Sequence, residues 1–431
     1  MKKRRVPELL IFAGIFLSAM VCGRAQTTVH SPITVPLHFT PTNSGADKLG
    51  IWVGIGSGAT PQLFEFDTGG TGFYAAYSPV SGVSPWWGGG VTVNASQQIH
   101  TAYDSGLNYF GNVAQGAVSI FASGNSTTPS VITAPTTQIG QMNQIEKINP
   151  SNGATTQLWT SSGNATASPP IDGAFYGDFG MNLAYNMGNF SSGITNLIGQ
   201  MNFGSGVTPG FRIHADFAGK TASLKIGLTA GDTASPTAKY FKMNADAQAP
   251  EGATMPVSGL DYYSQQLFNA DIEIQRSGHP PLVSTGVGMT PDTGASTTLH
   301  NTQLSPGGLP TEYASLIDWS NEQQNAGQLK DHLAFTLTGT TTSNQTVGIG
   351  NFTTNNVVNG GNVMVQNNRP NNTTYYLNTG ISLFYQYDLI YDMQAGVIGL
   401  DVIPEPSIGA LLLLGAVGLV FLRMLRSKRK A

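Results

Sequence analysis

The chain has 431 residues, and only 10% of them are charged. This length permits one large core or two domains. Residues 26–403 contain 10 basic and 22 acidic side chains, which gives this part of the chain a net charge of −12. Such a charge argues against nucleic acids and anionic membrane surfaces as partners, because both repel an acidic protein.

The first 25 residues have the composition of a secretory signal peptide. The basic stretch MKKRR is followed by the apolar run LLIFAGIFLSAMVC, and small residues precede Gln26. We predict cleavage after Ala25, with a retained membrane anchor as the alternative. The only cysteine, Cys22, lies in this leader. The exported chain must therefore be stable without disulfides, and a thiol-dependent enzyme is excluded.

Residues 26–403 have an all-β pattern. Short apolar runs alternate with Gly, Thr, Asn and Ser, as in LGIWVGIGSGATPQLFEF and VVNGGNVMVQ. Such runs, bounded by turn residues, predict strands and hairpins. Helical periodicity favours only residues 191–201 and 311–329. The polar segments 123–168 and 339–374 are predicted to be long surface loops or hairpin tips.

A carboxylate at the end of an apolar run is the strongest chemical signal in the chain. Asp67 ends the stretch QLFEF and is followed by Thr68 and Gly69. The same tripeptide returns 225 positions later as Asp292-Thr293-Gly294. Composition alone predicts about 0.2 copies, so two copies are unlikely to arise by chance. Strand interiors disfavour Asp, and a carboxylate near a core needs a partner or a shifted pKa.

Around these tripeptides the chain resembles the pepsin-like aspartic peptidases. Low-identity similarities occur in the family's order from about residue 45 to residue 403. They are GIGSGATPQLFEFDTGG (first hairpin and catalytic strand), TAYDSGLNYFGNVAQGAVSI (flap), IDGAFYG (residues 171–177, a loop-closing segment), SLKIGL (223–228, a strand near the lobe boundary) and GISLFYQYDLIYDMQAGVIGLDVI (380–403, the closing segment).

This resemblance implies an all-β, bilobal fold, with barrel-like or sandwich-like lobes around a cleft and a few short helices. The lobes are expected at residues 26–230 and 231–403. The implied activity is that of an exported aspartic endopeptidase acting on polypeptides without a metal or cofactor. The resemblance assigns this activity to seven residues. The catalytic pair is Asp67 and Asp292, the supporting residues are Thr68, Gly69, Thr293 and Gly294, and the flap residue that contacts substrate is Tyr103.

Two carboxylates fit this chemistry. A pair held close together cannot ionise fully at low cost, so the two share a proton and can act as general base and general acid on a water molecule. Each Asp comes from a different lobe, which explains the long separation in sequence. The adjacent glycines allow the backbone to approach the carboxylates closely.

Four positions depart from the family pattern. Gly70 and Ala295 stand where Ser or Thr is usual, Pro291 precedes the second Asp, and Tyr74 stands where Trp is frequent. Without a hydroxyl donor after each tripeptide, the pKa values of the pair are expected to be higher than in relatives that have one. These departures keep open the alternative of a catalytically inactive pepsin-like protein, or another β-rich surface or matrix protein.

The last 28 residues resemble a bacterial sorting signal. Pro404-Glu405-Pro406 precedes an uncharged run, Ser407–Leu422, and a basic tail follows. This order closely resembles the PEP-CTERM signal of Gram-negative bacteria. It implies a short helix that anchors the chain transiently in the inner membrane, and removal by an exosortase-type sorting enzyme. The destination would be the cell envelope, the outer surface or the medium. An ordinary C-terminal anchor is the alternative.

Other chemical motifs are weak. The seven histidines show no close pairing of the metal-site type, and no Gly-x-Ser-x-Gly motif is present. The pair Trp86-Trp87 has two interpretations, a carbohydrate or peptide platform and, as the favoured one, a hydrophobic plug over the first lobe.

Overall fold

The computed structural model describes most of the chain between the two terminal segments. The described residues are 28–43, 47–77, 87–103, 105–149, 153–161, 169–185, 194–217, 219–300, 311–320, 326–354, 362–366 and 376–403. The predicted signal peptide and the predicted sorting signal lie outside these ranges. Within them, no helix has the length and apolar character needed to cross a membrane.

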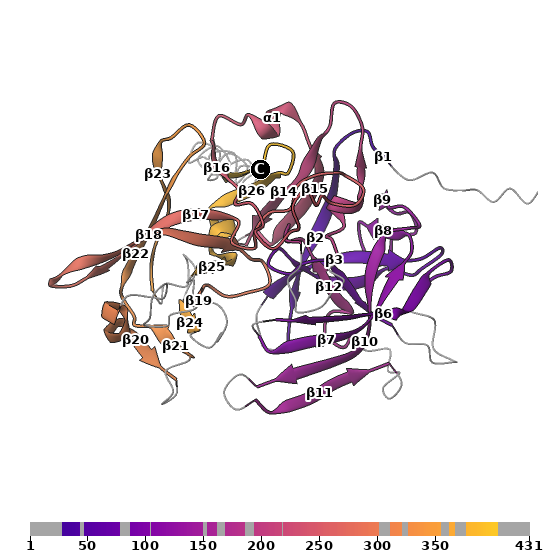
Figure 1. Cartoon of the computed structure of the whole chain (residues 1–431), viewed down its shortest axis with the longest axis horizontal. Coiled ribbons are helices and arrows are strands. Elements are labelled where there is room, and N and C mark those ends of the chain that lie inside the picture. Colours follow the sequence, from indigo (N-terminus) through magenta and orange to yellow (C-terminus); the bar gives the residue numbers. More distant parts are fainter. Residues whose placement is uncertain are drawn as a thin grey trace, which may run out of the picture.

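Strands make up nearly all of the regular structure (Figure 1). The largest sheet contains β2 (Ile33–Pro41), β3 (Asp47–Ile55), β4 (Gln62–Asp67), β5 (Phe73–Ala76), β6 (Thr92–Ala102), β7 (Leu107–Gln115), β8 (Val118–Phe121), β9 (Val131–Ile132), β10 (Gln138–Ile148), β11 (Thr155–Thr160), β12 (Gly177–Gly180), β14 (Thr208–Asp216), β15 (Thr221–Leu228), β16 (Ala238–Lys242), β26 (Tyr387–Asp392) and β27 (Val397–Val402).

A second sheet and a few short elements complete the described fold. The second sheet contains β17 (Phe268–Arg276), β18 (His279–Pro291), β19 (Thr298–His300), β20 (Ile317–Trp319), β21 (Ala326–Leu329), β22 (Ala334–Thr340), β23 (Thr346–Thr353), β24 (Met364–Gln366) and β25 (Tyr376–Gly380). The remaining elements are the pair β1 (Thr28–Val29) and β13 (Asn202–Phe203), helix α1 (Ala230–Thr233), and the 3₁₀ turns Ile198–Gln200, Thr311–Leu316 and Ile381–Tyr385.

The two large sheets contain the same five-strand arrangement. The order β3-β4-β12-β5-β10 in the first sheet corresponds to β17-β18-β25-β19-β24 in the second. The strand directions also agree: β4 is parallel to β12 and β18 is parallel to β25, whereas β12–β5 and β25–β19 are antiparallel. This internal repeat places the ends of β4 and β18, and hence Asp67 and Asp292, at equivalent positions.

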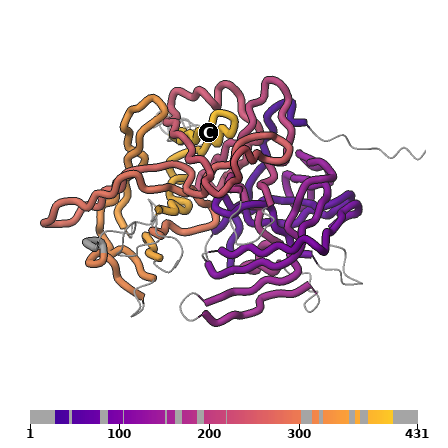
Figure 2. The backbone as a smooth tube through the Cα atoms, viewed as in Figure 1, coloured from indigo at the N-terminus to yellow at the C-terminus, as the bar shows by residue number. Residues whose placement is uncertain are grey.

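The first sheet unites strands from both ends of the chain. The final hairpin, β26 and β27, pairs with β14 through β26, and β16 adds to β27 at the sheet edge. In Figure 2 the yellow C-terminal strands accordingly lie beside segments from the middle of the chain. The prediction of a final hairpin is confirmed. The lobe boundary after residue 230 stays a prediction, and β16, β26 and β27 on its far side belong to the first sheet.

Aromatic packing fixes the strand that ends in the first Asp. Successive side chains of a strand point to opposite faces, so Phe64 and Phe66 of β4 share one face and Asp67 lies on the other. The rings of Phe66 and Phe179 stack with centroids 6.3 Å apart, and these two residues are register partners of β4 and β12. Both are completely buried, so the core sets the register that positions Asp67.

Two expectations from the sequence are wrong and a third holds only in part. Neither 191–201 nor 311–329 contains an α-helix in its described residues. In the first segment, Ile198–Gln200 form a single 3₁₀ turn, in which the Gly199 N–H donates to Asn196 Oδ1. After the second 3₁₀ turn, β20 and β21 pair with each other, because tertiary pairing overrides the weak helical periodicity. The supposed loops 123–168 and 339–374 contain the hairpin β10–β11 and the strands β23 and β24.

Arg212 on β14 lies within ion-pair distance of three buried carboxylates near the edge of the first sheet. Its Nη2 atom lies 2.6 Å from Asp388 Oδ2 and 3.0 Å from Asp401 Oδ2, and its Nη1 lies 3.6 Å from Asp232 Oδ1. Removing one member of a buried ion network leaves uncompensated charge, which is more costly than losing an exposed ion pair.

We therefore expect Arg212→Met to lower the free energy of unfolding by about 3 kcal/mol at pH 7, measured by urea denaturation. Lys220→Met is the matched control, since the ion pair of Lys220 with Asp47 is exposed, and its cost should stay below about 1 kcal/mol. Equal losses in the two variants would contradict the assignment of Arg212 as the neutralising group.

Candidate active site

Reciprocal hydrogen bonds join the two Asp-Thr-Gly turns. The Thr68 N–H donates to Thr293 Oγ1 at 3.1 Å, and the Thr293 N–H donates to Thr68 Oγ1 at 3.0 Å. Each hydroxyl then donates across the interface, from Thr68 to the Pro291 carbonyl at 2.9 Å and from Thr293 to the Phe66 carbonyl at 2.6 Å. Both threonines are buried. Their bonds hold the ends of β4 and β18 together.

The glycines of the two turns lie against the opposite carboxylates. The Gly69 N–H donates to Asp67 Oδ1 and the Gly294 N–H donates to Asp292 Oδ1, each at 2.7 Å. A Cβ atom on Gly69 would overlap the Asp292 carboxylate, and one on Gly294 would lie 2.7 Å from Asp67 Cγ. Only glycine fits at either position. The structure thus brings together Asp67, Asp292 and all four supporting residues predicted from the sequence.

The two carboxyl groups share an environment that disfavours two negative charges. Asp67 is 8% exposed and Asp292 is 7% exposed. Burial raises the pKa of Asp292 well above its usual range, and the negative charge of Asp67 and a hydrogen bond between the two carboxyl groups raise it further. The two carboxyl groups therefore share one proton as a pair. Such a pair can act as general acid and general base on a molecule bound between them.

Asn378 is a site residue that the sequence analysis missed. It lies on β25, and its Nδ2 atom donates to Asp292 Oδ2 at 2.6 Å. Its Oδ1 atom accepts from the Gly380 N–H at 2.8 Å, which fixes the orientation of the amide. Asn378 supplies the side-chain donor that Ala295 lacks. This donor comes from a different strand, and the signal available in the sequence was a polar residue two positions before Gly380.

Asp178 is a second site residue that was missed. It lies on β12, which runs beside the end of β4, with Gly180 paired to Asp67. The carboxyl group of Asp178 is 2% exposed, and a Cβ atom on Gly70 would lie 2.7 Å from its Oδ2 atom. A serine at position 70 would therefore collide with Asp178 in its present position.

Tyr103 lies at the turn of the hairpin formed by β6 and β7. Its N–H donates to the Leu107 carbonyl at 2.8 Å, and its carbonyl accepts from the Gly106 N–H at 2.9 Å. Its ring packs against that of Tyr109 with centroids 5.0 Å apart, and its hydroxyl donates to Asp178 Oδ2. The residue predicted to be the flap tyrosine is thus connected to β12, which pairs with β4 beside Asp67.

A further buried acid lies on β4, two residues before Asp67. Glu65 forms an ion pair with Lys48, with 2.7 Å between Oε1 and Nζ. Burial raises the pKa of Glu65 to about 7, although the positive charge of Lys48 opposes this shift. On the other lobe, burial lowers the pKa of His300 to about 4, and its ring stacks on Tyr376 with centroids 4.5 Å apart.

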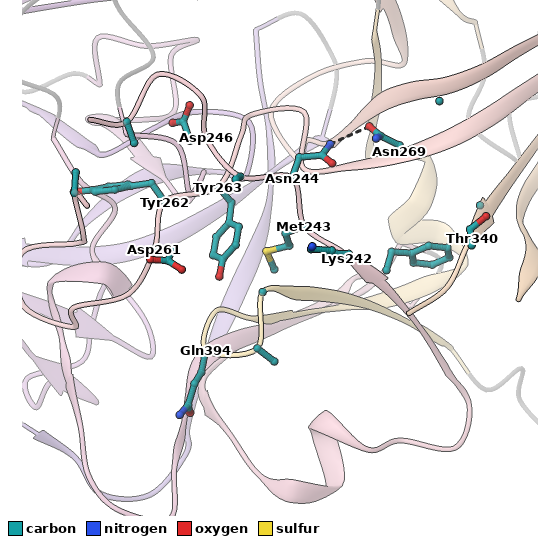
Figure 3. A pocket seen from close by; sticks show the side chains of 18 of the residues that line it. Lys242, Met243, Asn244, Asp246, Asp261, Tyr262, Tyr263, Asn269, Thr340 and Gln394 are labelled. Atoms are coloured by element: carbon teal, nitrogen blue, oxygen red, sulfur yellow. Dashed lines mark hydrogen bonds between the residues drawn. The ribbon is translucent and has the colours of Figure 1, made fainter. Parts of the chain in front are cut away.

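A cavity lies away from the Asp67–Asp292 pair. It measures about 910 Å³, is lined mainly by residues 241–246, 249–253, 261–263 and 394–396, and is bordered by neither Asp67 nor Asp292. Figure 3 shows its labelled side chains, including Asn244 and Asn269, which are joined by a hydrogen bond of 2.9 Å. Among the described residues no group of three or more His, Cys, Asp or Glu side chains could hold a metal ion.

The position of Trp87 agrees with the plug interpretation. Its side chain is 4% exposed, and its Nε1 atom donates to the Ala76 carbonyl at 3.0 Å. Its ring packs against that of Tyr77 with centroids 5.2 Å apart. A buried tryptophan offers no platform to a ligand. Its neighbour Trp86 lies outside the described residues.

Comparison with known proteins identifies the fold. No protein-family model and no curated protein matches the chain. The crystal structure of an aspartic proteinase from Irpex lacteus is similar, with a TM-score of 0.52 and 14% sequence identity. The match covers 88% of this chain and 100% of that chain. At this identity the likeness establishes the fold alone, and it confirms the all-β, bilobal fold expected from the sequence.

The raised pKa of Glu65 predicts a pH-dependent contribution to stability. Because the folded-state pKa of about 7 exceeds the ordinary value of 4.5, the native state holds this proton between those two pH values and the unfolded state does not. This contribution is present below pH 4.5 and is lost as the pH rises to 7. His300 acts in the opposite direction, since its lowered pKa adds stability as the pH rises from 4 to 6.5.

Comparing the stability of the Glu65→Gln variant with that of the wild type removes the contribution of His300, because both proteins contain His300. We expect the stability of Glu65→Gln relative to the wild type to rise by about 2 kcal/mol between pH 4.5 and pH 7, measured by urea denaturation at both pH values. A relative stability that stays constant or falls over this range would show that the native pKa of Glu65 is not raised.

Proposed function

We propose that this protein is an aspartic endopeptidase that hydrolyses peptide bonds with a water molecule activated between Asp67 and Asp292. The observation that carries the proposal is the pair of interlocked Asp-Thr-Gly turns, which hold two buried carboxyl groups in contact. The bilobal fold, similar to that of an aspartic proteinase, supports it.

We assign the steps by acid and base roles. Asp67, as the general base, takes a proton from the water molecule, and the oxygen of that water attacks the carbonyl carbon of the peptide bond. Asp292 gives its proton to the carbonyl oxygen, which produces a neutral tetrahedral diol. As the C–N bond breaks, Asp67 passes its proton to the leaving nitrogen, and Asp292 regains a proton from a diol hydroxyl as the carboxylic acid product forms. The carboxyl pair then has its original single proton.

Substitution of either carboxylate tests this proposal. We expect Asp67→Asn and Asp292→Asn each to lower kcat on a fluorescent casein derivative by at least about a hundredfold, because each removes one half of the acid–base pair. The assay should cover pH 3 to 7, and pepstatin should inhibit the wild type. Circular dichroism would establish that the variants are folded.

Asp261→Asn provides the matched control, since Asp261 lines the large cavity away from the dyad. It should retain wild-type kcat and KM. Full activity in a folded Asp67→Asn or Asp292→Asn variant would refute the proposed mechanism. A wild-type protein without peptidase activity would favour the alternative of a catalytically inactive pepsin-like protein or another β-rich surface or matrix protein.

We also propose that the protein is exported and trimmed at its C-terminus. The proposal rests on the leader, residues 1–25, and on Pro404-Glu405-Pro406 with its apolar run and basic tail. Mass spectrometry of the mature protein from its native host should find no peptide that contains the basic tail. Replacing Pro404-Glu405-Pro406 by three alanines should restore tail peptides, if recognition of this tripeptide is required for removal. Recovery of the tail in mature wild-type protein would favour a plain anchor.

A further inference from the structure

The internal repeat places a polar side chain at equivalent positions beside each Asp. Asp178 on β12 is two residues before Gly180 and pairs with Glu65 of β4. Asn378 on β25 is two residues before Gly380 and pairs with Thr290 of β18. Asn378 hydrogen-bonds Asp292 directly. The equivalent carboxyl group of Asp178 instead accepts a hydrogen bond from Tyr103.

Asp178 occupies a buried space between Gly70 and the hairpin turn. Its Oδ2 atom receives the Tyr103 hydroxyl, and its buried Oδ1 atom has no hydrogen-bond partner among the described residues. A Cβ atom on Gly70 would lie 2.7 Å from Asp178 Oδ2 and 2.9 Å from Asp67 Oδ2. The absence of a side chain at position 70 therefore gives Asp178 its room next to the Asp67 turn.

We propose that Asp178 is a positioning residue that holds Tyr103, and with it the β6–β7 hairpin turn, at the Asp67 side of the dyad. This inference rests on the proposed peptidase function in one respect: in a peptidase the hairpin turn covers a bound polypeptide. Asp178 acts through Tyr103, which is the residue placed to contact substrate.

The surroundings favour an uncharged carboxyl group in this role. Burial raises the pKa of Asp178 well above its usual range, and the negative charges of Asp67 and Glu65 raise it further, although the hydrogen bond from Tyr103 and the positive charge of Lys48 oppose this shift. The other titratable groups at the site are the hydroxyls of Tyr74, Tyr103 and Tyr109, whose pKa values burial also raises. A protonated carboxyl group accepts from Tyr103 without repelling Asp67, and an asparagine side chain has the same shape and the same carbonyl acceptor.

A double-mutant cycle tests the link between Asp178 and Tyr103. Tyr103→Phe and Asp178→Leu should each lower kcat/KM on the casein derivative by about tenfold, mainly by raising KM, because both remove the same hydrogen bond. The double variant should be no more than about twofold worse than either single variant. Asp178→Asn should retain kcat/KM within about threefold of the wild type, because its carbonyl accepts from Tyr103.

Tyr240→Phe is the matched control. It also removes a hydroxyl hydrogen bond, the 2.6 Å bond to the Asp232 carbonyl, but at the edge of the first sheet. It should leave kcat and KM unchanged. Losses that multiply in the double variant would overturn the proposal, as would an Asp178→Asn protein that is folded yet as impaired as Asp178→Leu.

Amide hydrogen exchange separates this inference from the proposed function, since it needs no activity. The Tyr103 and Gly106 amides close the hairpin turn, and their exchange should be about tenfold faster in Tyr103→Phe and Asp178→Leu than in the wild type. Exchange in Asp178→Asn and Tyr240→Phe should match the wild type. Unchanged exchange in Tyr103→Phe would overturn the role of Asp178 even in an active peptidase, and faster exchange would support it even in an inactive protein.

Discussion

The site depends on the exchange of hydrogen bonds between Thr68 and Thr293. Each threonine receives the N–H of the other turn and donates its hydroxyl to a strand carbonyl of the other half. Since both side chains are buried, no water replaces these bonds, and a change at either residue leaves unpaired polar groups in the interior. The position of the two carboxylates therefore follows from hydrogen bonds between each threonine side chain and the backbone of the opposite half.

The two halves are alike in topology and different in chemistry. Beside Asp292 the repeat provides an amide donor, Asn378, whereas beside Asp67 it provides a carboxyl group that faces the hairpin turn. A symmetric backbone thus gives each Asp a different neighbour.

The sequence predicts the parts of this site that are written in short motifs. The two Asp-Thr-Gly turns and Tyr103 were visible because the chemistry and the turn lie within three or four consecutive residues. Gly70 and Ala295 were visible as departures, but their compensation was not. Asp178 and Asn378 come to lie beside the Asp67 and Asp292 turns through parallel pairing of β12 with β4 and of β25 with β18. Long-range register of this kind cannot be derived from local composition. The strands β20 and β21 were missed for the same reason, because their state depends on a partner, β24, that is distant in sequence.

The strand order of the first sheet also constrains how the chain reaches its native state. Arg212 of β14 is bound to Asp388 of β26, 176 positions later in the sequence, and β14 cannot gain this neighbour until the last strands exist. The first sheet therefore cannot be completed before the C-terminal strands have been synthesised. Dependence on contacts so far apart slows folding. For the export proposed above, such a delay is useful, because a chain that has not completed its sheet is still able to pass through a translocation channel.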